Sequence, residues 1–156
     1  MITQTRVYTL PVDTPGGVIH LPVTHTVIDE NEERMWVTLS VDVQAQMVSV
    51  DAETTEEALI KLVGSFPGDW RIHSCLSCRY GHFCPVGNAD NEVFCVTEFE
   101  PEKVADLWQV TEDEKERAQR SRTLFHTCDK YAQQSEAYFT YNDYYSAVHK
   151  LETQNP

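Results

Sequence analysis

WRIHSCLSCRYGHFCPVGNADNEVFCV, residues 70–96, holds four of the chain's five cysteines. Cys75 and Cys78 form a CxxC pair within it, Cys95 lies near its end, and Cys128 belongs to a separate segment. Two residues between cysteines let a tight turn aim both thiolates at one point, and a second pair then completes a tetrahedron around Zn²⁺. The spacing therefore predicts a structural zinc site, around which we expect the rest of the chain to fold.

Five thiols are available for the four ligand positions. We expect Cys75, Cys78, Cys95 and Cys128 to bind the zinc ion, because Cys84 precedes a proline in a loop rich in turn-forming residues. The alternative is a purely local set, in which Cys84 takes the place of Cys128. Imidazole also binds zinc, and the histidines that could replace one thiolate are His73, His82 and His126.

Other chemistry uses the same residue types. Thioredoxin-like CxxC motifs lie in a βαβ context, and nothing before Cys75 predicts one. Disulfides form in oxidising compartments, and the first residues lack the apolar core of a signal peptide. An iron–sulfur cluster also uses four thiolates, so it stays open beside zinc, as do free buried thiols.

Several motifs accompany the cysteines, namely C-x-x-C-x-Y from Cys75 to Tyr80, P-x-G-N from Pro85 to Asn88, and then Cys95 and Cys128. With these motifs, residues from about 35 to 131 resemble a family of small, largely uncharacterised bacterial proteins. The resemblance implies a β-rich first half and matches the four cysteines expected to bind zinc. Residues 90–92 and those after 131 depart from the family pattern. The resemblance implies no activity.

Composition and charge limit the classes of partner. The chain has 156 residues, 41% of them hydrophobic, and a net charge of −13 from 25 acidic and 12 basic side chains. Such a surface repels nucleic-acid phosphates and speeds encounter with a basic protein. No apolar run approaches the length of a membrane helix. We therefore expect a cytoplasmic protein that binds neither membrane nor nucleic acid.

The first half of the chain shows strand and helix patterns. Residues 5–28 predict two strands joined by a turn at 13–17, and residues 35–51 predict an antiparallel hairpin. Thr54 and Glu57 have capping-box spacing, which predicts the start of a helix. That helix carries one apolar face for packing on the sheet, formed by Ala58, Leu59, Leu62, Val63 and Phe66.

The second half predicts mainly helices. One follows Pro101, and a second capping box at Thr111 opens another. An apolar stripe at helical spacing then carries Cys128 towards the metal site; its members are Leu124, Phe125, Cys128, Tyr131 and Ala132. The stretch Tyr138–Tyr145 has five aromatic residues in eight, which suits either core packing or an interface.

Together these patterns predict an α+β fold in one domain over residues 1–156. An antiparallel β-sheet with one packed helix occupies 1–69, a cysteine-rich zinc-knuckle segment 70–131, and an aromatic tail 132–156, with the C-terminal part mainly helical. No phosphate loop, HExxH or GxSxG motif is present. We therefore expect a protein-binding protein rather than an enzyme, of the immunity type that occludes a basic toxin such as a nuclease. The alternatives are a thiol-based redox-responsive protein or enzyme using Cys84, and a nucleic-acid-binding zinc ribbon.

Overall fold

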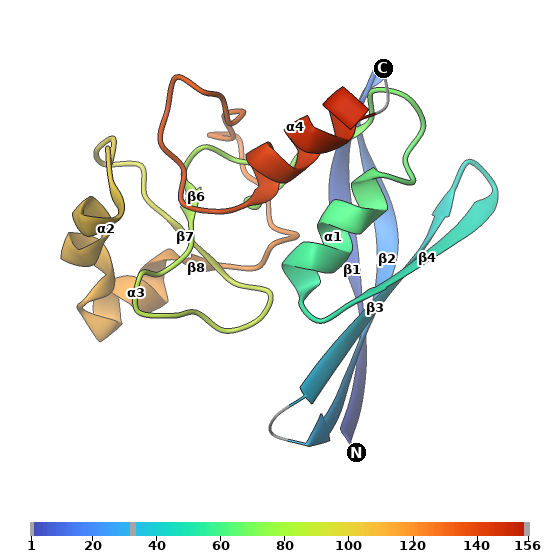
Figure 1. Cartoon of the computed structure of the whole chain (residues 1–156), viewed down its shortest axis with the longest axis horizontal. Helices are drawn as coiled ribbons and strands as arrows, with labels where there is room; N and C mark the ends of the chain where they lie inside the picture. Colours follow the sequence, from blue (N-terminus) through green and yellow to red (C-terminus); the bar gives the residue numbers. More distant parts are fainter. Residues whose placement is uncertain (1, 32–33, 155–156) are drawn as a thin grey trace. The chain divides into compact units, whose positions relative to one another are not determined.

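The computed structural model describes residues 2–31 and 34–154 and contains two compact units, Met1–Ile72 and His73–Pro156. The first unit is an antiparallel sheet in the strand order β4-β3-β2-β1-β5 with one helix, α1. Its elements are β1 (Ile2–Thr14), β2 (Gly17–Asn31), β3 (Arg34–Val43), β4 (Gln46–Ala52), α1 (Thr55–Val63) and β5 (Arg71–Ile72). Figure 1 shows α1 lying against the sheet near β3 and β4.

Alternation of apolar and polar residues explains the sheet. On β3, Val37, Leu39 and Val41 are buried, whereas the intervening residues are more exposed. Because successive side chains of a strand point to opposite faces, one face of β3 forms the core. The matching stripe of α1 buries Leu59 and Leu62, so helix and sheet remove apolar surface from water together.

Two turns set the strand register. The predicted turn at residues 13–17 is confirmed, because Thr14 pairs with Gly17 and the whole of β1 pairs with β2. The β3–β4 turn lacks a strong sequence signature, yet Gln44 and Ala45 both take positive φ, at 53° and 64°. Two consecutive residues of positive φ match the twist that a two-residue hairpin requires.

The second unit has a three-stranded sheet, in the order β6-β7-β8, and three short helices. Its elements are β6 (Gly81–His82), β7 (Val93–Cys95), α2 (Val104–Thr111), α3 (Glu114–Arg120), β8 (Ser121–Arg122) and α4 (Tyr144–Gln154). Long stretches between them are turns and loops (Figure 1). Among the described residues, no helix is both long enough and apolar enough to cross a membrane.

The predicted fold class is wrong. The structure is mostly β, with 37% strand and 23% helix, and its C-terminal part is not mainly helical. The stripe from Leu124 to Ala132 forms turns and loops instead of a helix. Gln134 follows this stripe and is hydrogen-bonded to a loop far away in sequence. Its Nε2 donates to the carbonyl oxygens of Leu76 and Cys78, at 2.8 and 3.2 Å. These long-range bonds outweigh the local helical preference.

The second capping box is also misplaced. Thr111 is the last residue of α2, where its Oγ1 donates to the Leu107 carbonyl at 2.7 Å. Asp113 caps α3 instead, and its side chain accepts from the amides of Lys115 and Glu116. A carboxylate can cap a helix as well as a hydroxyl can, and here the hydroxyl serves the preceding helix.

The first capping prediction is confirmed at its central bond, because Thr54 Oγ1 accepts from the Glu57 amide at 3.1 Å. We expect Thr54→Ala to lower the free energy of unfolding by about 1 kcal/mol, since an amide in the first helical turn loses its acceptor. Thr54→Ser is the matched control and should stay close to the wild type. Urea titration measures both, and equal stability of all three proteins would contradict the assigned role of the cap.

Candidate functional site

The CxxC segment is a tight turn made by its own backbone. The Ser77 amide donates to the Ser74 carbonyl at 3.0 Å, and the Gly81 amide donates to the Cys78 carbonyl at 3.1 Å. Ser74 and Ser77 are buried and reinforce this turn, because the Ser74 amide donates to Ser77 Oγ at 3.1 Å. Both thiols of the pair, on Cys75 and Cys78, are therefore held on a segment with little freedom.

Backbone bonds bring the other two cysteines to this turn. Cys95 pairs with Gly81 across β6 and β7. The Cys75 amide donates to the His126 carbonyl at 2.7 Å, which places the 126–128 segment beside the turn. The structure thus assembles Cys75, Cys78, Cys95 and Cys128 from three separate stretches of the second unit. We refer to them as the four-thiol group.

The pKa of the Cys75 thiol reflects the proximity of the other three cysteines. Its pKa is raised to about 12, first by burial and then by electrostatic coupling to Cys78, Cys95 and Cys128, while Arg122 opposes the rise. The pKa of Cys95 is raised as well, chiefly by burial. Cys75 and Cys95 are consequently protonated thiols near neutral pH. The sequence does not indicate that Arg122 acts on the Cys75 thiol, because this arginine follows a helix with mixed charges.

The predicted zinc site is wrong. Among residues 2–31 and 34–154, no three His, Cys, Asp or Glu side chains form a group that could hold a metal ion. The thiols are neighbours without converging as ligands, and Cys75 Sγ instead hydrogen-bonds to His126 Nδ1 at 3.2 Å. The same finding excludes the alternative set containing Cys84. Hydrogen bonds join the segments of this site.

The histidines considered as ligands have other partners. His73 stacks on Tyr131, with ring centroids 3.7 Å apart, and the Tyr131 hydroxyl lies 3.0 Å from Ser77 Oγ. His82 accepts a hydrogen bond from the Tyr141 amide. His126 reaches a thiol of the group, because its Nδ1 hydrogen-bonds to Cys75 Sγ.

Accessibility differs sharply within the group. Cys75 and Cys78 are buried, Cys95 is half-buried and Cys128 is exposed, and none of these cysteines forms a disulfide. Cys84 is also reduced but is only 4% exposed. The group therefore combines one exposed thiol with three less accessible ones, which suits thiol–disulfide chemistry.

Gly81 is needed for the close approach of the turn. A Cβ at this position would overlap the carbonyl oxygen of Cys75, which belongs to rigid backbone. We expect Gly81→Ala to lower the free energy of unfolding by at least about 2 kcal/mol and to expose buried thiols. Urea titration and thiol labelling measure the two effects. Gly16→Ala is the matched control because its added Cβ makes only ordinary contact, so equal losses in both variants would contradict the clash.

His82 makes the stability depend on pH. Burial lowers its pKa from 6.5 to about 4, and the residue is 1% exposed. The unfolded chain therefore binds a proton at His82 more readily, so stability is complete above pH 6.5 and falls as the pH drops towards 4. Between pH 6.5 and 5 this group should cost about 2 kcal/mol.

We expect His82→Gln to reduce that dependence, because glutamine keeps an acceptor for the Tyr141 amide but does not titrate. Urea titrations at both pH values, on wild type and variant, measure the difference. Carboxylates still titrate alike in the two proteins, so their contribution cancels. An unchanged pH dependence in His82→Gln would show that His82 does not bind the proton.

Comparison of the chain with protein-family models, with curated proteins and with solved structures finds no match. The resemblance of residues 35–131 to a bacterial family therefore stays a prediction. Neither these comparisons nor the described residues support the expected immunity or toxin-inhibitor role, so that role is not retained.

Proposed function

We propose that this is a thiol-based redox-responsive protein, in which Cys128 meets the oxidant and then forms a disulfide within the four-thiol group. The observation that carries the proposal is one exposed thiol beside three less accessible ones, all reduced. Redox-sensing cysteines are typically accessible and lie next to a second, resolving thiol. Cys128 meets both conditions, whereas the buried Cys84 does not.

The oxidant we consider is hydrogen peroxide. The Cys128 thiolate attacks one peroxide oxygen, the O–O bond breaks, and the products are a sulfenic acid and hydroxide, which takes up a proton to become water. A second thiol then attacks the Cys128 sulfur, the S–S bond forms, and the sulfenic oxygen leaves as water. In sum, two thiols and one peroxide give one disulfide and two waters. A dithiol reductant reverses the change.

His126 favours Cys75 as the second thiol. The high pKa of Cys75 leaves it protonated and therefore a poor nucleophile. Its sulfur lies 3.2 Å from His126 Nδ1, so the imidazole can accept the proton as the new bond forms. Cys128 is two residues from His126 along the chain. A disulfide between Cys75 and Cys128 would join two segments that are already linked, because the Cys75 amide donates to the His126 carbonyl.

Peroxide oxidation tests the proposal. We expect a small excess of hydrogen peroxide to lower the number of free thiols from five to three, because one disulfide consumes two. Mass spectrometry of proteolytic peptides should then identify a cross-link that includes Cys128. Thiol labelling after dithiothreitol should recover all five.

Single substitutions give the decisive comparison. Cys128→Ser should form no disulfide at the same peroxide concentration, whereas the matched control Cys84→Ser should oxidise like the wild type. His126→Asn should slow disulfide formation and let the sulfenic acid persist long enough for a dimedone-type trap. Disulfide formation at wild-type rate in Cys128→Ser, or peroxide products without any disulfide in the wild type, would refute the proposed function.

A further inference from the structure

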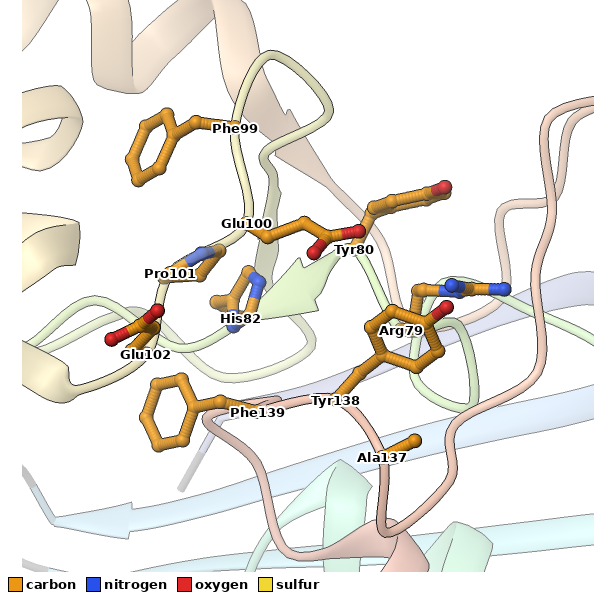
Figure 2. Close-up of a pocket in the computed structure, with 10 residues that line it drawn as sticks. All are labelled: Arg79, Tyr80, His82, Phe99, Glu100, Pro101, Glu102, Ala137, Tyr138 and Phe139. Carbon is orange, nitrogen blue, oxygen red and sulfur yellow. The ribbon is translucent and has the colours of Figure 1, made fainter.

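A second site lies in the same unit, apart from the cysteines. A pocket of about 310 Å³ is lined by Arg79, Tyr80 and His82 together with residues 99–102 and 137–139. Its volume is at the small end of the range for ligand pockets. The volume suits one long side chain or a small molecule rather than a folded surface. Figure 2 shows Glu100 and Glu102 on one wall, Tyr138 and Phe139 on the facing wall, and His82 between them.

The aromatic walls are supported from behind. Phe99 and Phe139 pack against a small buried cluster formed by Val96, Leu107 and Val110. Phe139 also stacks on His82, with ring centroids 6.3 Å apart. These contacts fix the pocket's walls before any ligand arrives, which lowers the entropic cost of binding.

The carboxylates of the pocket make no ion pair with any residue that the structure describes. Among the described residues, neither Glu100 nor Glu102 has an ion pair or a side-chain hydrogen bond, although Arg79 lines the same pocket. Arg79 instead lies over the Tyr138 ring, with its guanidinium carbon 4.0 Å from the centroid. Figure 2 shows Arg79 at one end of the pocket and Glu102 with Phe139 at the other. The end with Glu102 therefore combines negative charge with an aromatic ring.

We propose that this pocket binds a lysine or arginine side chain of a basic peptide, with the cation beside the carboxylate of Glu102 and the ring of Phe139, while Glu100 adds negative charge to the same pocket. Aromatic faces attract cations, and two free carboxylates supply the opposite charge. His82 adds no repulsion, because burial keeps its ring neutral near neutral pH. The net charge of −13 assists the encounter with such a peptide. The site uses none of the thiols, so it goes beyond the redox function proposed above.

Arg79 supplies the discriminating comparison between a cationic and an anionic ligand. Its guanidinium makes no ion pair among the described residues, so an anion would bind at that end of the pocket. A cationic side chain, by contrast, gains from removal of the arginine charge. The two classes of ligand therefore predict opposite effects of Arg79→Gln.

Nuclear magnetic resonance titration tests the proposal. The probe is an acetylated and amidated Gly-Gly-Lys-Gly-Gly peptide, and the matched probe replaces lysine with norleucine, which keeps the alkyl chain but lacks the ammonium. We expect the lysine peptide to shift backbone amides in 99–102 and 137–139 and to bind at least about tenfold more tightly than the norleucine peptide. Binding should weaken as salt is added, because screening reduces the attraction.

Variants with matched charge distinguish the contribution of the pocket's carboxylates to binding from the contribution of the chain's net negative charge. The double variant Glu100→Gln with Glu102→Gln should lose at least about tenfold in affinity, whereas Glu53→Gln with Glu112→Gln, which removes the same charge elsewhere, should lose less than about twofold. Arg79→Gln should bind the lysine peptide at least as tightly as the wild type. Equal losses in the two double variants, or lost binding in Arg79→Gln, would overturn the proposal, as would amide shifts confined to other residues.

Discussion

The carbonyl oxygen of Cys75 occupies the space into which any side chain at residue 81 would project. Only glycine lets the chain pass this point, and passing it starts β6 directly behind the CxxC turn. From there Gly81 pairs with Cys95 and His82 pairs with Phe94, so β7 follows from the same close approach. The small sheet of the second unit, and the position of Cys95 in the four-thiol group, both depend on this contact between two segments of backbone.

Side-chain amides then complete what the turn begins. Asn142 Nδ2 donates to the carbonyls of Gly81 and Leu76, at 2.7 and 3.1 Å. Gln134 is 5% exposed and donates to the Leu76 carbonyl as well. Buried carbonyls without partners are costly, so these two amides fix the loop from about 130 to 142 against the turn. These hydrogen bonds link the segments that we expected a zinc ion to join.

One short strand serves both proposed sites. Gly81 faces the cysteine turn, and His82, the next residue, lies in the pocket with its Nδ1 bonded to Tyr141. Neighbouring residues of a strand point to opposite faces, so a single strand can support thiol chemistry on one side and ligand binding on the other. The two sites use different chemistry: thiols whose reactivity depends on exposure, and carboxylates with aromatic rings that attract a cation.

The sequence by itself determined the elements whose signals are local. The hairpin at residues 13–17, the alternation on β3 and the cap at Thr54 each depend on residues a few positions apart, and net charge depends only on composition. Tertiary structure decided the features that depend on contacts between residues far apart in the sequence. The stripe from Leu124 to Ala132 has helical spacing. However, its carbonyls accept hydrogen bonds from the Ser74 hydroxyl and from the amides of Cys75 and Arg79, some 50 residues away, which hold it as a loop. Likewise, the cysteine spacing predicted four metal ligands, but the tertiary structure shows neighbouring thiols that do not form a metal site. Ligand geometry depends on where three separate segments meet, and the spacing along the chain does not determine that.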